Sequence, residues 1–309
     1  MPATDYLGLN KLPDIDVEAL IFLIIGFFWG GFTAPVSIKL AGIYGIIDIP
    51  DARKIHKGKM PRGAGLGLWM GYLLISVIMS ESMPELRFIA TGATIIFFCG
   101  YLDDMCSLSP FLRLGLHFIA ASIVVLPLGL PLTITIISLV WLAGVTSAYN
   151  LIDGMNGLCI SMFIASSGAL YILGKSYAGI YMGAMALGVL CWNFPAAQTF
   201  LGDGGSTLLG YLFASHFLKN AMPNLINAKF TDILLLLILF GGIPVIDTTI
   251  AFTRRILSGK SPFYPDKKHM HHILISLTGS NVITVSILLL LQVLTLAGGL
   301  SVYFRLIGQ

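Results

Sequence analysis

Residues 193–210 read NFPAAQTFLGDGGSTLLG and lie between two strongly apolar runs, 177–193 and 205–220. The one carboxylate of this stretch, Asp203, has glycines on both sides. A charge this close to hydrocarbon is costly unless it is paired, hydrated or bound to a metal. Glycines allow backbone to approach a ligand or to take positive φ. The stretch therefore predicts a turn between membrane helices, in which Asp203 either caps a helix or meets a cation and a phosphate.

Composition places the whole chain in a membrane. Of the 309 residues, 56% are hydrophobic and 11% are charged, whereas a soluble domain has about 25% charged residues. The sequence predicts one all-α polytopic integral membrane domain over residues 1–309. The sequence contains no basic domain and no base-stacking module, so nothing in it indicates nucleic-acid binding. The four cysteines are scattered singly, without the spacing of a zinc site or a disulfide framework.

Ten apolar runs are near the length of about 20 residues that crosses a hydrocarbon core. Ten spans would place both termini on one side of the membrane, and eleven spans remain an alternative. The predicted spans are 18–38, 64–81, 87–102, 113–128, 132–149, 159–174, 177–193, 205–220, 231–252 and 282–303.

The loops between these spans separate into two sets by charge. One set holds 12 of the 18 Lys and Arg residues, so the positive-inside rule places it in the cytoplasm. Every cluster of acids, histidines and glycine turns falls in that set. The sequence therefore predicts one site at the cytoplasmic face, built from loops 39–63, 103–113, 149–158, 193–204 and 253–281.

The first two of these loops carry opposite charges. Arg53, Lys54 and Arg62 are predicted to bind phosphate or to contact anionic lipid. Asp103 and Asp104 are adjacent carboxylates, which repel unless water or a cation is near. They also end a span, where the helix dipole opposes acids. We expect one to bind a metal while the other accepts a proton, with a pair of hydrated end-of-helix acids as the alternative.

The third loop holds Asn150 and Asp153, which are three residues apart and share one face if the segment is helical. An amide and an acid on one face suit a nucleotide or a metal, and a polar turn that caps the next span is the alternative. Asn156 follows in the same loop.

The last loop is the richest in chemistry. It has an arginine pair, Arg254 and Arg255, and three histidines, His269, His271 and His272. Carboxylates dominate the set of loops, which favours Mg²⁺ or Mn²⁺ over zinc. Cationic side chains beside acids suit a pyrophosphate whose charge shifts during reaction. The isolated histidines of the apolar runs, His117 and His216, are interpreted as packing residues.

Five stretches in this order resemble the polyprenyl-phosphate N-acetylhexosamine-1-phosphate transferases, in particular the bacterial undecaprenyl-phosphate GlcNAc-1-phosphate transferase branch of glycosyltransferase family 4. They cover the chain between about residues 40 and 275. The matching stretches are DIPDARKIHKGKMPRGAG, GYLDD, NLIDGMNGL, NFPAAQTFLGDGGSTLLG and PVIDTTIAFTRRILSGKSPFYPDKKHMHH.

The resemblance implies a reaction. N-acetylhexosamine-1-phosphate, with GlcNAc as the expected sugar, would pass from a UDP-sugar to undecaprenyl phosphate, releasing UMP and starting a cell-surface glycan. The family also implies Mg²⁺ as the cofactor and a homodimer. It further implies a multi-pass protein of the bacterial inner membrane that contacts membrane lipid. Direct attack and an aspartyl-phosphate intermediate both remain open.

The resemblance also assigns roles by position. Asp103 and Asp104 match the acidic pair, and Asp203 matches the Mg²⁺ ligand. Asp103 is expected as a second ligand of the same metal. The other matches are Asn150 and Asp153 for the nucleotide-side pair, Asn193 for the Asn before the Pro-Ala turn, Phe200 for the aromatic that stacks on uracil, and His269, His271 and His272 for the pyrophosphate motif.

Two positions depart from the family pattern. Asn156 stands where many bacterial members have Asp, and Ser147 stands where many have Asn. An Asn at 156 brings no charge, so the expected nucleotide contact there is weakened.

Two other functions remain as alternatives. One is the phospho-MurNAc-pentapeptide transferase of peptidoglycan synthesis, whose histidine loop typically lacks the Ser-Pro-Phe-x-Pro-Asp lead found here. The other is a multi-span transporter or lipid flippase. Transporters usually carry ionisable groups near mid-span and inverted repeats, whereas here the acids cluster at the cytoplasmic ends of spans.

Overall fold

The computed structural model describes residues 16–45, 47–48, 60–261, 266 and 268–308. Within this part of the chain the fold is helical, with one short antiparallel pair of strands, β1 (Ile47–Asp48) and β2 (Met60–Pro61). Each predicted span coincides with a helix: α1 (Val17–Tyr44), α2 (Ala64–Ile78), α3 (Leu86–Cys106), α4 (Pro110–Val125), α5 (Leu132–Ile152), α6 (Leu158–Gly174), α7 (Tyr177–Asn193), α8 (Gly202–Ala221), α9 (Phe230–Leu257) and α11 (Asn281–Ile307).

The all-α polytopic fold class is confirmed. By length and composition, six helices in the described residues can cross a membrane: α1, α3, α4 together with its 3-10 extension η3 (Leu126–Leu128), α5, α9 and α11. The count of ten crossings stays a prediction. The sequence did not predict the short helix α10 (Met270–Thr278), and a second 3-10 turn, η4 (Met222–Leu225), follows α8.

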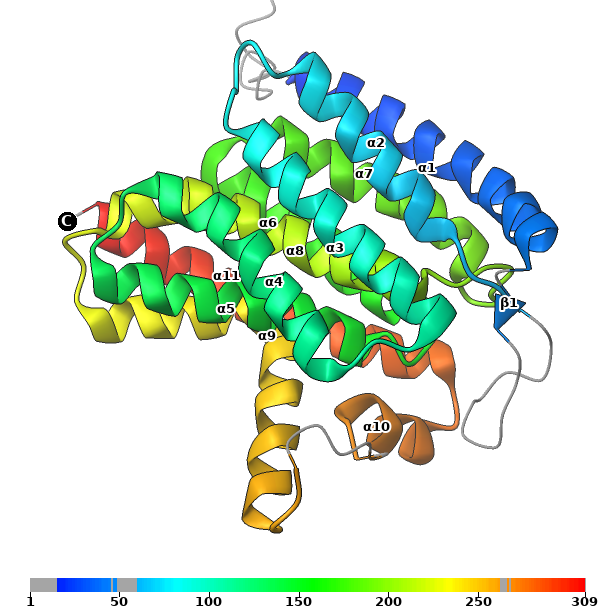
Figure 1. The fold of residues 1–309 in the computed structure, drawn as a ribbon. Coiled ribbons are helices and arrows are strands. Elements are labelled where there is room, and N and C mark those ends of the chain that lie inside the picture. Colours follow the sequence, from blue (N-terminus) through cyan, green and yellow to red (C-terminus); the bar gives the residue numbers. More distant parts are fainter. Residues whose placement is uncertain (1–15, 46, 49–59, 262–265, 267, 309) are drawn as a thin grey trace, which may run out of the picture.

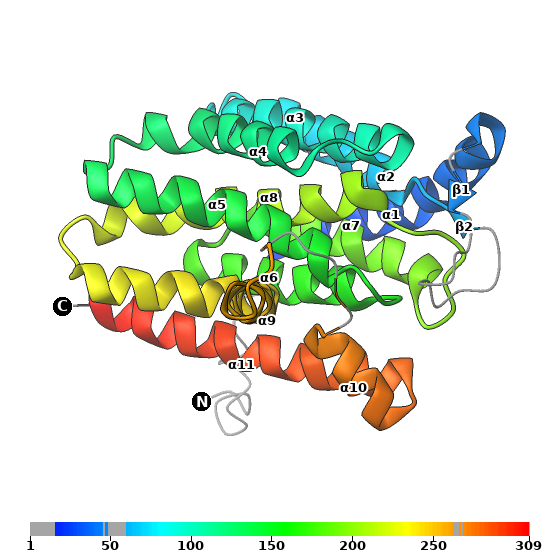
Figure 2. The ribbon, with the colours of Figure 1, turned by 60° about the horizontal axis from the view of Figure 1, so that its bottom comes forward.

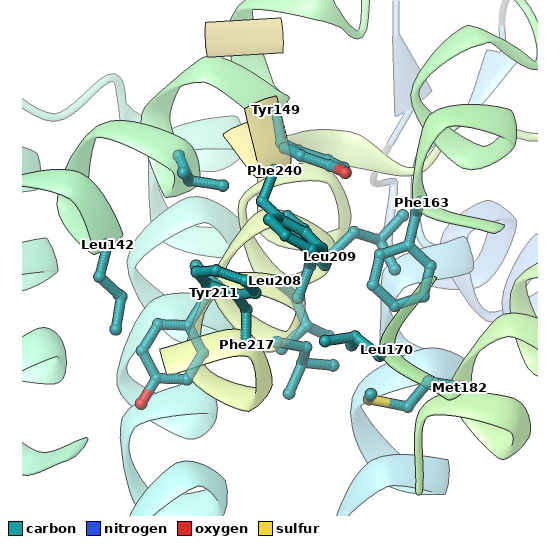
Figure 3. Close-up of a cluster of buried hydrophobic side chains, with 14 of the residues drawn as sticks. Leu142, Tyr149, Phe163, Leu170, Met182, Leu208, Leu209, Tyr211, Phe217 and Phe240 are labelled. Carbon is teal, nitrogen blue, oxygen red and sulfur yellow. The ribbon is translucent and has the colours of Figure 1, made fainter. Parts of the chain in front are cut away.

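Helix α8 lies at the centre of the bundle, between α5 and α7 in the view of Figure 2. Its residues from Gly204 to Leu218 are all buried, as expected for a helix that is apolar all round. In Figure 3 its Leu208, Leu209 and Phe217 lie among aromatic side chains of neighbouring helices. The first turn of α8 carries Asp203, so the most buried helix fixes the position of this acid.

Small residues let the outer helix α1 approach α7. Gly26, Gly30 and Ala34 recur every four residues and are buried, while Phe28 and Phe32 on the outward face are 68% and 72% exposed. A Cβ on Gly30 would lie 2.0 Å from a backbone oxygen of α7. Such a stripe is typical of helix pairs in membranes, where close backbone packing replaces the hydrophobic effect.

Helix α9 is broken in the middle. Gly242 takes φ 59° and ψ −153°, and Pro244 follows two residues later. Both residues interrupt the helical hydrogen-bond ladder. Figure 1 shows the second half of α9 turning away from the bundle, with α10 beside it. This half-helix leads into the arginine pair and the histidine loop.

Candidate active site

A cavity of about 520 Å³ lies where four of the five predicted cytoplasmic loops meet. Its walls come from α3, α4, α5, α8, α9, α10 and the segment before α10. The polar and charged lining residues are Asp103, Arg113, His117, Ser147, Asn150, Asp153, Asp203, Thr207, Thr248, Arg255, Asp266, His269, His271 and His272. The clustering expected from the loop charges is therefore present in space.

Asp203 faces this cavity from the first turn of α8, and its side chain is 35% exposed. Asn150 of α5 donates from Nδ2 to Asp203 Oδ2 at 3.3 Å, and Ser206 donates to Asn150 Oδ1 at 2.8 Å. Ser206 thus sets which end of the Asn150 amide points at the acid. The dipole at the start of α8 favours the negative charge.

Arg113 joins the two acids that were predicted to hold metal. Its Nη1 forms an ion pair with Asp103 Oδ2 and lies 3.7 Å from Asp203 Oδ2. Ser109 caps α4 by accepting from Leu112 N at 3.2 Å, with Pro at the first helical position, which fixes the turn that carries Arg113. Sequence reasoning counted Arg113 only among the cytoplasmic charges, although it begins an otherwise apolar span.

Asp104 is placed differently from its neighbour Asp103. Its Oδ1 accepts from Arg62 at 2.6 Å, and its Oδ2 accepts from Asp203 N at 2.7 Å. The side chain is 4% exposed and does not line the cavity. Asp104 therefore satisfies an N–H at the start of α8, and the catalytic role that the sequence suggested for it stays a prediction. Arg62 likewise holds Asp104 and is absent from the cavity lining.

The glycines around Asp203 serve helix packing. Gly202 has φ 72°, the positive φ that was expected in this stretch. A Cβ on Gly204 would lie 3.0 Å from Phe97 O, and one on Gly205 would lie 2.9 Å from the Cα of Gly65. These two glycines thus bring α3 and α2 against α8, and the expected close approach to a ligand stays a prediction.

A chain of hydrogen bonds and ion pairs holds the histidine segment. Asp247 of α9 accepts from His269 Nδ1 at 2.8 Å and from Met270 N at 2.9 Å. Arg255 donates to His269 Nε2 at 3.2 Å and to Asp266 Oδ2 at 2.9 Å. Because Arg255 can only donate, His269 carries its proton on Nδ1. Both nitrogens of His269 are thus committed to protein partners.

The charge on Asp266 depends on these arginines. Burial alone would raise the pKa of Asp266, but hydrogen bonds from Arg255, from the backbone N–H of Lys268 and from Arg254 hold that pKa well below its ordinary value. Arg254 donates to both carboxylate oxygens at 2.9 Å. Arg254 therefore anchors the loop and is not in the cavity lining.

His271 has a different environment from His269. It is 1% exposed, and neither ring nitrogen has a hydrogen-bond partner within the described residues. Burial lowers the pKa of His271 to about 3. Gly154 makes room for it, since a Cβ there would lie 2.4 Å from His271 Nε2. A buried polar group without a partner is costly, so His271 is the histidine whose geometry points to a bound ligand.

Of two further cavity residues, one was predicted as a site residue from the sequence and the other was not. Asp153 was predicted and lines the cavity directly after α5. Its burial, with smaller effects from Asp203 and Asp104, raises its pKa to about 8. His117 was interpreted as a packing residue, but it lines the cavity, with Nδ1 3.1 Å from Ser147 Oγ. His216 does pack, hydrogen-bonded to Tyr72 in the bundle.

Three predicted substrate-binding residues hold loops together instead of lining the cavity. Asn193 accepts from Gly157 N at 2.6 Å and donates to Thr199 O at 2.7 Å. Asn156 donates to Pro195 O at 3.3 Å. Phe200 pairs through its backbone with the strand segment at Pro61 and Arg62. Arg53 and Lys54 lie outside the described residues.

Comparisons with known proteins agree with this geometry. A model of glycosyl transferase family 4 matches residues 86–220. The chain is 31% identical to a probable undecaprenyl-phosphate N-acetylglucosaminyl 1-phosphate transferase of Bacillus subtilis, over 89% of this chain and 83% of that protein. It is 30% identical to an undecaprenyl-phosphate alpha-N-acetylglucosaminyl 1-phosphate transferase of Thermotoga maritima, over 74% and 72%.

A third relative extends the match along the chain. A decaprenyl-phosphate N-acetylglucosaminephosphotransferase of Mycobacterium tuberculosis is 25% identical over 98% of this chain and 86% of that protein. The chain therefore belongs to glycosyl transferase family 4, as its five ordered stretches indicated.

Proposed function

We propose that this protein transfers N-acetylhexosamine-1-phosphate, with GlcNAc as the sugar, from a UDP-sugar to a polyprenyl phosphate, releasing UMP. One observation carries the proposal. Asp103, Arg113 and Asp203 meet in the same cavity as His271, whose two nitrogens have no partner within the described residues. Acids, a fixed cation and a hydrogen-bonding imidazole are the groups that a pyrophosphate and a metal require together. The names of the relatives supply the sugar and the lipid acceptor.

The donor set supports Mg²⁺ as the cofactor. Asp103 and Asp203 bracket one cationic group, Arg113, and the Asn150 amide adjoins Asp203. Mg²⁺ commonly uses one or two carboxylates and completes its shell with water and substrate phosphate. Within the described residues no three His, Cys, Asp or Glu side chains form a closed cage, which is consistent with that mode. When bound, the metal would supply positive charge against the pyrophosphate.

The protein's own groups fit an in-line displacement at phosphorus. An oxygen of the lipid phosphate bonds to the phosphorus that carries the sugar, and the bond from that phosphorus to the bridging oxygen breaks, its electrons leaving with UMP. Arg113 offsets the negative charge of the reacting phosphates, and a neutral His271 offers one N–H donor to their oxygens. Holding the two phosphates in line supplies much of the rate in such reactions.

The cavity is proposed to open to the cytoplasm of a bacterium. The loops that form it carry most of the Lys and Arg residues, which favours that side. A membrane-impermeant maleimide tests the orientation in inside-out and right-side-out vesicles. The exposed Cys106 ends α3 beside the cavity. Cys191, which is also exposed, is replaced by serine in both proteins, and a variant with Cys106→Ser and Ser82→Cys moves the reporter to the segment just before α3. Labelling of position 106 in inside-out vesicles only, and of position 82 in right-side-out vesicles only, supports the orientation, and the reverse pattern contradicts it.

The reaction is tested with purified protein in lipid nanodiscs containing undecaprenyl phosphate. UDP-GlcNAc should yield UMP and a lipid product heavier by one GlcNAc-phosphate, detected by mass spectrometry. UDP-GalNAc and UDP-MurNAc-pentapeptide are supplied separately to identify the donor. Product with UDP-MurNAc-pentapeptide alone would instead assign the peptidoglycan branch, and no UMP with any donor would contradict transferase activity.

The metal is tested by binding as well as by turnover. Adding Mg²⁺ and UDP to metal-stripped protein should raise its thermal unfolding temperature, because a ligand that binds the folded state stabilises it. Asp203→Asn should remove that shift. Asp232→Asn, which changes the first-turn acid of α9 away from the cavity, should retain it. An equal shift in both variants would contradict Asp203 as a ligand.

A further inference from the structure

The break in α9 exposes a backbone group that needs a partner. Because Gly242 is not helical, Ile243 lies in the first turn of a new half-helix, where backbone N–H groups generally lack an intrahelical acceptor. An unsatisfied N–H is costly in the interior of a membrane protein. The Oε1 atom of Gln292 in α11 accepts from Ile243 N at 2.8 Å. A side chain from another helix therefore caps the second half of α9.

The amide of Gln292 is held at both ends. Its Nε2 donates to Ser166 Oγ of α6 at 3.1 Å, and Ser166 Oγ lies 3.0 Å from the hydroxyl of Tyr149 in α5. All three side chains are buried at 0% exposure. With both ends of the amide bonded, the position of the Gln292 oxygen is fixed, and so is the start of the half-helix. A closed polar network of this kind rigidifies its surroundings.

The close packing at Gly242 supports the same arrangement. A Cβ at Gly242 would lie 2.3 Å from Gln292 Oε1, and the φ of 59° is unfavourable for other residues. Glycine is thus required for both the backbone turn and the approach of the amide. The break and its cap form one unit made by two distant parts of the sequence.

The half-helix beyond the break carries one side of the cavity. Asp247 lies one turn after Ile243 and holds both His269 and the N-terminus of α10. Thr248, Phe252 and Arg255 line the cavity further along. The direction in which the half-helix leaves the bundle therefore decides where the histidine segment lies relative to Asp203 on α8.

The network also reaches the other side of the cavity. Tyr149 immediately precedes Asn150, whose amide contacts Asp203. The same three buried side chains thus join α5 near the acids to the start of the half-helix that carries the histidines.

We infer that Gln292 is a positioning residue for the transfer reaction: it caps the second half of α9 and so sets the histidine segment against the Asp203 side of the cavity. This inference rests on the proposed function for its kinetic consequence but not for its structural one. Gln292 lies outside the cavity lining, so its effect passes through the backbone of α9.

The test compares four variants in lipid nanodiscs. Gln292→Leu removes both hydrogen bonds at similar volume, Gln292→Glu keeps an acceptor oxygen, and Gly242→Ala disturbs the turn from the other partner. The matched control, Tyr72→Phe, removes another buried hydrogen bond, the one from Tyr72 to His216 at 3.0 Å, which does not touch α9. The measurements are steady-state kinetics with UDP-GlcNAc and a spin-label distance between positions 256 and 136.

Those label positions report the half-helix against α5. Ile256 is 59% exposed and Ile136 is 53% exposed, so cysteines there accept labels without entering the core. The native exposed cysteines, Cys106 and Cys191, are replaced by serine in every sample.

We expect Gln292→Leu and Gly242→Ala to broaden or shift the distance distribution. Their kcat should fall about tenfold to a hundredfold, the size expected when reacting groups are misplaced by about 1 Å. The KM for UDP-GlcNAc should change little, because the nucleotide need not contact the displaced segment to bind. Gln292→Glu should restore most of the activity, and Tyr72→Phe should lower thermal stability without changing kcat or the distance.

An unchanged narrow distance in Gln292→Leu overturns the inference, whatever its activity. If that variant does not fold, the contrast between Gln292→Glu and Gly242→Ala decides. A distance distribution like that of the wild type in both variants overturns the inference. Wild-type protein without transferase activity would contradict the proposed function alone, since the distances would still show whether Gln292 directs the half-helix.

Discussion

Two aspartates at the beginnings of helices have very different surroundings. Asp16 caps α1 and accepts from Ala19 N at 3.0 Å, from the hydroxyl of Tyr171 at 2.6 Å and from that of Tyr177 at 3.4 Å. The hydrogen bond from Tyr171 is the main cause of its lowered pKa. The carboxylate of Asp16 is thus saturated with protein donors and anchors α1 to α6 and α7.

Asp203 begins α8 with few donors. The amide nitrogen of Asn150 lies 3.3 Å from its Oδ2, and the guanidinium of Arg113 lies 3.7 Å away. The same feature of sequence, an acid at a helix start, therefore gives a saturated anchor in one place and a carboxylate that faces a cavity in the other. The distinction depends on how many donors the neighbouring helices bring to the carboxylate.

The largest expected effect separates the two acids directly. Asp203→Asn should lower the rate of UMP release about a thousandfold, because a metal ligand contributes several kcal/mol to transition-state charge stabilisation. Asp16→Asn should leave the rate unchanged. Initial rates at saturating Mg²⁺, with thermal unfolding as a folding control, check this. Asp203→Asn activity within about threefold of wild type would remove Asp203 from the site.

The next effect concerns the cation between the acids. Arg113→Ala should lower kcat about a hundredfold, the cost typical of losing one charge-stabilising group. Arg113→Lys should recover part of that loss, since lysine keeps the charge but not the planar geometry. Arg87→Ala, at the opposite end of α3, is the matched control and should have no effect on kcat. If both alanine variants behave alike, Arg113 acts only as a surface charge.

A smaller effect comes from His271. Its folded pKa of about 3 lies below the ordinary value of 6.5, so between these values the unfolded chain binds the extra proton. Stability therefore falls as the pH drops below about 6.5, by at most about 1.4 kcal/mol per pH unit from this group. His271→Gln should flatten the fall between pH 6.5 and 5.5. Unfolding temperatures at these two pH values measure it, and parallel curves for both proteins would contradict a buried neutral His271.

The smallest effect is structural. Asp16→Asn should lower the free energy of unfolding only slightly, because asparagine can still cap α1 but loses the charge near the helix N-terminus. Tyr171→Phe should act in the same direction by removing the shortest hydrogen bond to Asp16. Chemical denaturation in detergent measures both. A loss of activity without a loss of stability in either variant would give Asp16 a role beyond anchoring.

Much of the fold could be predicted from the sequence because hydrocarbon imposes a simple rule. Each apolar run long enough to cross the membrane satisfies its backbone only as a helix, and every predicted span has its helix. The grouping of loops by charge likewise predicted four segments that meet at the cavity, while the fifth, 39–63, contributes none of its described residues to the lining. The Pro244 that marks the break in α9 was visible, but the direction of the second half was not.

Individual roles within the site were harder to predict. Asp103 and Asp104 are adjacent in sequence, yet one faces the cavity and the other caps α8, because consecutive helical positions point about 100° apart. Arg113 and His117 lie one turn apart on α4 and both line the cavity. Their runs looked apolar, so only the packing of α4 beside α3 and α5 identified them.

The sequence by itself determined the class of molecule, the positions of its helices and the family, since these depend on hydropathy, local spacing and ordered motifs. Tertiary structure decided which polar groups are saturated and which are open. It filled the carboxylate of Asp16, left that of Asp203 facing a cavity, and joined Gln292 to the break in α9. Hydrogen-bond saturation depends on donors brought from distant helices, and no local pattern in the chain encodes that arrangement.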